Sequence, residues 1–291
     1  MTHFGPETAA GKGLRGVAQE MRKGIPAGAF PTFSYRKTRA LLENLMKRAL
    51  IAAAVAGVVA AAAAPALAAE ESPFSANVSI VSDYKFRGLS QTNAEPALQG
   101  GFDYAHASGL YLGTWASSIS WLSDGQADVS SSLEWDFYGG YSGTSGEFGY
   151  DFGLLYYYYP GSYPGGFNSP DTLEAYVKGS WKFLSLKYSH SLTDLFGAVD
   201  SKNSNYLDLG AEFALPQGYT LGAHVGHQKI KGMAGSCDSY IDYSVGVSKS
   251  FGGFDFGLNY VDTDYDDQCM TNAFGEKLGK GTVVLSVGKT F

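Results

Sequence analysis

The stretch YIDYSVGVSKSFGGFDFGLNY, residues 240–260, contains two alternating segments separated by a pair of glycines. In residues 241–247 the apolar and aromatic side chains Ile, Tyr, Val and Val alternate with Asp, Ser and Gly. Residues 254–260 repeat this pattern with Phe, Phe, Leu and Tyr alternating with Asp, Gly and Asn. A period of two is typical of a strand that has an apolar environment on one face and a polar one on the other. The glycines at 252–253 predict a hairpin turn between the two strands.

The same alternation recurs from residue 76 to the end of the chain, and it predicts twelve strands. Each is long enough to cross a bilayer at a tilt, which takes about 9–11 residues. The predicted strands are 76–87, 97–106, 110–119, 131–141, 147–159, 171–182, 184–194, 205–214, 219–230, 240–251, 254–264 and 281–291.

Short and long connections alternate between these strands. The short ones are 107–109, 142–146, a turn near 183, 215–218 and 252–253. The long ones are 88–96, 120–130, 160–170, 195–204, 231–239 and 265–280. This asymmetry is typical of outer-membrane barrels, which have short periplasmic turns and longer external loops. We therefore predict an all-β fold, an up-and-down antiparallel transmembrane β-barrel of twelve strands, because a closed barrel satisfies every backbone polar group inside the bilayer.

Charge alternates with aromatic residues at the end of the first predicted strand, SDYKFRG. In a barrel, Asp83, Lys85 and Arg87 are expected to face the lumen, and Tyr84 and Phe86 the lipid. The same rule places further charged residues on the lumen lining: Asp103, Glu134, Asp136, Asp151, Glu174, Lys178, Asp208, Glu212, Asp242 and Asp255. The lining is thus mixed in charge and mainly acidic. The first three charges could instead pair across the lumen and plug it.

A secretory signal is predicted at residues 46–68. Met46 and two basic residues precede an uncharged apolar run and the A-x-A cleavage pattern Ala66-Leu67-Ala68. Residues 1–45 are basic and patternless, and we interpret them as a wrongly assigned start or a disordered segment. Residues 69–291 then form a single barrel domain in the bacterial outer membrane.

The charge of the exported chain limits its partners. Removing residues 1–68 takes away nine basic and three acidic side chains and leaves a net charge of −13. Such a chain is not expected to bind nucleic acid, because that binding needs cationic contacts to phosphates. The expected partners are outer-membrane lipid and lipopolysaccharide, the barrel assembly machinery and small solutes.

Two further features suit an exported barrel. Cys237 and Cys269 lie in predicted external loops on either side of one hairpin, and we predict a disulfide between them. The last strand, GTVVLSVGKTF, ends in Phe291. A terminal aromatic on an alternating last strand resembles the signal read by the barrel assembly machinery, although Lys289 takes an outward position that is usually apolar.

The segment SDYKFRGLSQT, followed by EPALQGGFDYAHASGLYLGTWASSISW, resembles the opening signature of the TorF-like porin family. The residues that carry the resemblance are Ser82, Asp83, Tyr84, Arg87, Gly88, Ser90, Gln91, Pro96, Gly109, Tyr111, Gly113 and Trp115. The match is dense over 76–121 and continues as a general pattern to the end of the chain. It implies a proteobacterial outer-membrane barrel and a porin, without naming a solute.

Three functions remain open at this stage. Twelve strands lie between the filled eight-stranded barrels and the open sixteen-stranded porins, so a narrow channel for small hydrophilic solutes is expected, with a modest preference for cations. A lipid hydrolase would need a catalytic pair at the rim, where only His190 and His227 qualify, and no pattern identifies a nucleophile for them. A closed barrel acting as an anchor or adhesin is the third.

We predict no catalytic residue, no cofactor and no metal site. The acidic stretch DTDYDD, residues 262–267, begins like a calcium loop but lacks its Gly and Glu.

Overall fold

The computed structural model describes residues 72–125, 128–272 and 274–291. The predicted segments 1–45 and 46–68 lie outside the described residues. Within the described ranges, no helix is both long and apolar enough to span a membrane.

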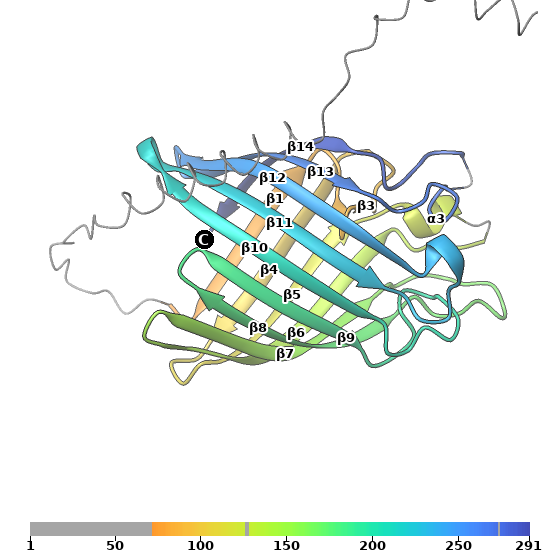
Figure 1. The fold of residues 1–291 in the computed structure, drawn as a ribbon, viewed down its shortest axis with the longest axis horizontal. Helices are drawn as coiled ribbons and strands as arrows, with labels where there is room; N and C mark the ends of the chain where they lie inside the picture. The colour runs from red at the N-terminus through yellow and green to blue at the C-terminus, as the bar shows by residue number, and fades with distance from the viewer. Residues whose placement is uncertain (1–71, 126–127, 273) are drawn as a thin grey trace, which may run out of the picture. The chain divides into compact units, whose positions relative to one another are not determined.

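Twelve antiparallel strands form a closed barrel, in which each strand pairs with its neighbour in sequence and the last pairs with the first (Figure 1). The strands of the barrel are β1 (Phe74–Val81), β4 (Ala97–Ala105), β5 (Leu110–Ser118), β6 (Leu133–Ser145), β7 (Phe148–Tyr158), β8 (Thr172–Trp181), β9 (Leu184–Ser191), β10 (Asn205–Leu215), β11 (Tyr219–Lys229), β12 (Ser239–Phe251), β13 (Phe254–Thr263) and β14 (Thr282–Thr290). The predicted fold class and strand number are confirmed.

The seam of the barrel lies between β1 and β14, which pair from Asn77↔Thr290 to Val81↔Ser286. Beyond this ladder, the backbone N–H of Phe291 donates to the carbonyl of Ala76 at 2.8 Å, and the N–H of Ala76 donates back at 3.2 Å. The final residue of the chain therefore closes the barrel, and no strand edge remains at the seam.

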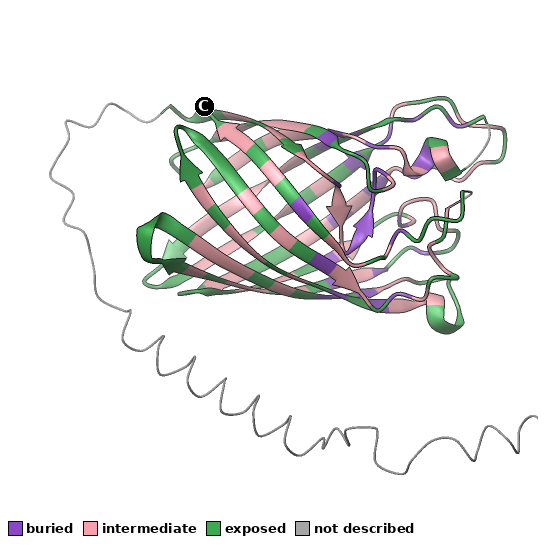
Figure 2. Cartoon of the chain, turned by 90° about the horizontal axis from the view of Figure 1, so that it is seen from above, coloured by how far each residue is buried: buried purple, intermediate pink, exposed green. Residues whose placement is uncertain are grey.

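The outer surface of the barrel is apolar because the strands alternate. In β13, Phe256, Leu258 and Tyr260 are 45%, 46% and 40% exposed. Figure 2 shows exposed and less exposed residues alternating as stripes along the strands. Large apolar side chains exposed on every strand are costly in water and favourable in hydrocarbon. The exterior is therefore suited to lipid.

The connections alternate in length as the sequence predicted. Short turns lie at 106–109, 146–147, 182–183, 216–218 and 252–253, at the barrel end where the chain terminates (Figure 1). The opposite end carries long loops, which are 82–96, 119–132, 159–171, 192–204, 230–238 and 264–281. One loop includes the short helix α3 (Trp121–Gly125), and another includes the 3₁₀ turn η3 (Gly235–Cys237). Among the short connections, Pro216–Gly218 forms the 3₁₀ turn η2.

The prediction for the first strand was wrong at its end. The barrel strand β1 stops at Val81 instead of Arg87, and the next residues form a separate two-stranded hairpin, β2 (Lys85–Phe86) and β3 (Leu89–Ser90). Tyr84 and Phe86 accordingly do not face lipid. They contact side chains of the barrel's inner face.

We expect a new charge to destabilise the barrel by different amounts on the two faces of β13. Leu258→Arg places a cation at mid-strand on the apolar outer face, which should cost about 2–4 kcal/mol of folding free energy in lipid. Asn259→Arg places the same charge at the next position, which lines an internal cavity, and should cost much less. Denaturant titration of the barrel folded into vesicles measures both. Equal losses for the two variants would contradict the assignment of the faces.

Candidate functional site

The hairpin β2–β3 is built around a tight turn at Arg87 and Gly88. Both residues have positive φ, 47° and 80°, as a two-residue turn of the I′ type requires. A Cβ on Gly88 would lie 2.7 Å from Cβ of Asp242 on β12. Glycine is therefore required at position 88 for two reasons, which are its backbone conformation and the close approach of the hairpin tip to the barrel wall.

The base of this segment is held by the carboxylate of Asp83, which is only 2% exposed. Asp83 accepts hydrogen bonds from the hydroxyls of Ser90 at 2.6 Å and Thr92 at 3.3 Å. The Lys85 ammonium lies 3.4 Å from it and also donates to the backbone carbonyl of Leu278 at 3.2 Å. The segment thus folds on itself and is tied to the loop before β14.

Arg87 connects the hairpin tip to two distant strands. Its guanidinium donates to both oxygens of Glu174 on β8, at 2.9 and 2.7 Å, and to Oε1 of Gln228 on β11 at 2.7 Å. It also lies over the rings of Phe86 and Tyr206, 4.8 and 4.4 Å from their centroids. Burial lowers the pKa of Arg87, but the attraction of Glu174 outweighs it and raises the pKa above its usual value. The guanidinium therefore stays charged.

Aromatic contacts pack the other side of the hairpin. The Tyr84 hydroxyl donates to Glu134 on β6 at 2.9 Å, and its ring meets Trp115 edge-on at 5.5 Å between centroids. Phe86 meets Tyr157 and Phe196 edge-on at 5.7 and 5.5 Å. Burial, together with Glu134, raises the pKa of Tyr84 well above its usual value, so its hydroxyl remains a donor. The segment is thus anchored by packing as well as by charge.

Tyr157 and Tyr159, which the sequence predicted to narrow the mouth, are both 3% exposed, whereas Tyr156 and Tyr158 lie on the outer face at 37% and 36%.

Three adjoining cavities run along the barrel axis. A vestibule of about 720 Å³ between the long loops and an inner cavity of about 520 Å³ both have Phe86 and Arg87 in their walls. The inner cavity shares His224, Asn259 and Ser286 with a third cavity of about 530 Å³ toward the short turns. The hairpin is therefore a constriction between the vestibule and the rest of the lumen.

Several predicted lumen residues accept hydrogen bonds from tyrosine hydroxyls on the inner face of the barrel. Asp103 on β4 accepts from Tyr138 on β6 at 2.5 Å, and Asp151 on β7 accepts from Tyr111 on β5 at 2.6 Å. These strands are not neighbours in the barrel, so the side chains meet only through its inside.

A second group surrounds His224 on β11. Its Nδ1 lies 3.3 Å from Asp208, and its Nε2 lies 2.7 Å from Asp242. Asp242 is fully buried and also accepts from the hydroxyl of Tyr206 at 3.0 Å.

The remaining predicted residues lie apart from these two groups. Glu134 and Glu174 are 2% exposed beneath the hairpin, and Asp136 is 7% exposed. Lys178 and Glu212 line the cavity toward the short turns. Asp255 lies at the start of β13 and accepts a hydrogen bond from the hydroxyl of Ser250.

Sequence reasoning missed several inward residues that contribute to the site. Lys187 and Gln228 have the inward parity of their strands and line the inner cavity and the vestibule. For Lys187 the signal was present, because Leu184, Leu186 and Tyr188 alternate around it as exposed residues. The tyrosine donors were missed because a tyrosine suits either face of a membrane strand.

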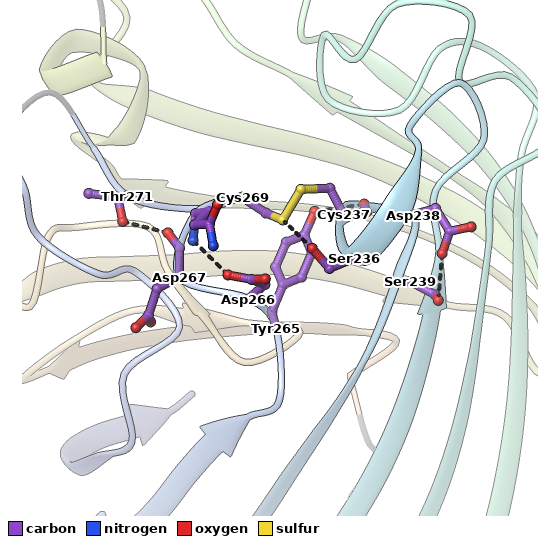
Figure 3. Close-up of a disulfide and its surroundings, with 10 residues drawn as sticks. Ser236, Cys237, Asp238, Ser239, Tyr265, Asp266, Asp267, Cys269 and Thr271 are labelled. Carbon is purple, nitrogen blue, oxygen red and sulfur yellow. Dashed lines mark hydrogen bonds between the residues drawn. A yellow bond between two sulfur atoms is a disulfide. The ribbon is translucent and has the colours of Figure 1, made fainter. Parts of the chain in front are cut away.

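The loops of the vestibule are tied together by a disulfide between Cys237 and Cys269, with 5.4 Å between the Cα atoms (Figure 3). The Tyr265 hydroxyl donates to the Cys237 carbonyl at 3.0 Å, and its ring stacks on Tyr240 at 4.3 Å. Leu89 of the hairpin belongs to the same buried cluster. The disulfide therefore joins the two loops beside the constriction.

His190 and His227, the histidines considered for catalysis, have the outward parity of their strands. His190 contacts the Tyr188 hydroxyl at 3.3 Å and the Asn203 side chain at 3.2 Å. In the described part of the chain, no group of three or more His, Cys, Asp or Glu side chains is arranged to hold a metal ion.

Comparison with known proteins identifies a family to which the chain is similar. Residues 65–291 match the model of a family described as "Bacterial protein of unknown function (Gcw_chp)". The chain belongs to that family. No curated protein matches its sequence.

Solved barrels of similar architecture include the KdgM porin, which is 11% identical over 75% of this chain and 98% of its own, with a TM-score of 0.46. The NanC porin is likewise 11% identical, over 74% of this chain and 98% of its own, also at 0.46. LpxR from Salmonella typhimurium matches at 11% identity over 75% of this chain and 99% of its own, at 0.37.

The ion pair between Arg87 and Glu174 yields a test of how firmly the hairpin is held. Arg87→Ala leaves Glu174 buried without its cation, so we expect a loss of about 3–5 kcal/mol in unfolding free energy. Adding Glu174→Gln to this variant should recover much of the loss, because the uncompensated charge is removed. Denaturant unfolding of the four proteins in the cycle measures the coupling, and strictly additive losses would show that the pair is not coupled.

The disulfide yields a second test. It closes a segment of 32 residues, and on the chain-entropy model it contributes about 3–4 kcal/mol. We expect Cys237→Ser/Cys269→Ser to make the loops 230–238 and 264–281 sensitive to external protease while the strands stay protected. Mass spectrometry of the digests locates the cuts, and two free thiols in the parent protein would contradict the bond itself.

Proposed function

We propose that this protein is a porin-like channel of the bacterial outer membrane that lets small hydrophilic solutes pass down their gradients, and that its family is the TorF-like porins. The observation that carries the proposal is a lumen enclosed by a barrel with an apolar exterior, with a vestibule on one side of a single constriction and two cavities lined by polar side chains on the other. An anchor has no need of a hollow polar interior, whereas a channel requires one.

The constriction supports a narrow pore. Phe86 and Arg87 lie in the walls of both cavities that meet there. Twelve strands enclose less space than the sixteen or more of open porins, so one hairpin is enough to narrow the lumen. A solute must pass beside this hairpin, and the groups exposed in the adjoining cavities then select among solutes.

A specific observation also favours a second candidate, the closed barrel. Arg87 bonds to two strands and Tyr84 to a third, so the hairpin is well enough anchored to act as a plug. The two candidates differ in a single measurable property, the ion conductance of the resting protein.

Single-channel recording tests the channel. In planar bilayers, the protein extracted from membranes of cells that express the full chain should give small, discrete current steps. Phe86→Ala removes an aromatic ring from the constriction and should enlarge these steps. Phe256→Ala removes a ring from the lipid-facing side and should leave the conductance unchanged, which makes it the matched control. Silence from wild type and from Phe86→Ala would favour the closed barrel.

A further inference from the structure

Four charged side chains on the lumen wall form a row across the neighbouring strands β7 to β10. Asp151 on β7 pairs in register with Lys178 on β8, Lys178 pairs with Lys187 on β9, and Lys187 pairs with Asp208 on β10. All four have the inward parity of their strands. The two lysines in the middle are therefore directly opposite each other on the inner face of the barrel.

Two like charges directly opposite each other on a sheet face repel, since their Cβ atoms are only about 4.5–5.5 Å apart. A carboxylate beside each cation would relieve the repulsion in such a pair. The outer members of the row, Asp151 and Asp208, stand in the right places to do this.

Both carboxylates are bonded elsewhere. Asp151 accepts from the hydroxyl of Tyr111 at 2.6 Å, and Tyr111 in turn meets the hydroxyl of Tyr176. Asp208 pairs with Nδ1 of His224 at 3.3 Å. Across residues 72–125, 128–272 and 274–291, no carboxylate oxygen lies within 4.0 Å of the ammonium of Lys178 or Lys187.

Both lysines also face open space. Lys187 lines the inner cavity below the constriction, and Lys178 lines the adjoining cavity toward the short turns. The Lys187 ammonium lies 4.4 Å from the ring centroid of Tyr176, so its side chain extends toward the strand that carries Lys178. A solute that moves between the two cavities passes this pair.

We propose that Lys178 and Lys187 form an anion-binding subsite on the lumen wall, for small solutes that carry a carboxylate or phosphate group. This rests on the proposed channel and names its substrate class. An oxyanion between the two ammonium groups relieves their repulsion, and the narrow lumen strengthens the attraction relative to bulk water. The subsite also opposes the cation preference expected from counting charges, because Asp151 and Asp208, the carboxylates beside the two lysines, are already bonded elsewhere.

Inorganic phosphate tests the subsite. The protein extracted from membranes of cells that express the full chain is recorded in planar bilayers in potassium chloride, with phosphate added in steps. Phosphate should block the wild-type current. In Lys178→Gln/Lys187→Gln the block should weaken about tenfold or more, as expected when charged hydrogen bonds are lost. The same measurement with acetate distinguishes phosphate from carboxylate recognition.

Two further variants control the result. Lys249→Gln removes a lysine that has the outward parity of β12, with its ammonium 4.3 Å from the ring centroid of Tyr219, and should leave the block unchanged. Tyr111→Phe keeps both lysines but frees Asp151 to pair with Lys178, so it should also weaken the block. Heat-modifiable migration on gels establishes that each variant is folded.

The outcomes separate the two proposals. Current that phosphate blocks equally in wild type and in the double variant overturns the subsite and leaves the channel standing. Absence of current in every protein, including Phe86→Ala, overturns the channel. In that case the ³¹P line width of phosphate with detergent-solubilised barrel decides the subsite. Broadening by wild type and not by the double variant supports it, and no difference overturns it.

Discussion

The structure depends on one constraint, which is that no backbone polar group can be left unpaired in hydrocarbon. Twelve antiparallel strands meet it only if the last strand pairs with the first, and the seam from Asn77↔Thr290 to Val81↔Ser286 does this. The reciprocal bonds between Phe291 and Ala76 extend the ladder to the end of the chain. Once the sheet is closed, the period of two divides the side chains between lipid and lumen, and every later property follows from that division.

The enclosed interior then holds charged side chains, several of which pair with one another. The hairpin β2–β3 brings an arginine to the lumen, and Glu174 and Gln228 receive its hydrogen bonds. Taking two ions out of water is costly unless their geometry is good and their other groups are bonded, and the two-point contact between Arg87 and Glu174 meets that condition. The same segment that narrows the lumen is therefore fixed to its wall by interactions that a simple loop would not need.

Formal charge is a poor guide to the field in this lumen. Most of its carboxylates accept hydrogen bonds from tyrosines, as Asp103 does from Tyr138, or pair with a cation, as Glu174 does with Arg87. Neutral residues such as Gln99 and Ser286 also line the inner cavity. The field in the lumen is set by the charges that no opposite charge neutralises, and among the described residues these include Lys178 and Lys187 in a lumen whose composition is acidic.

By itself the sequence determined the fold class, the strand number, the alternation of short and long connections and the parity of residues such as Glu134 and Asp208. These features depend on local periodicity, which can be recognised within a single strand. Only the tertiary structure decided where Tyr84 and Phe86 point. A period of two is the same whether a strand runs on or folds back, and the turn at Arg87 and Gly88 is stabilised by residues far away in the sequence. The partners of each lumen charge were likewise decided across the barrel, because contacts between strands that are distant in sequence leave no periodic signal.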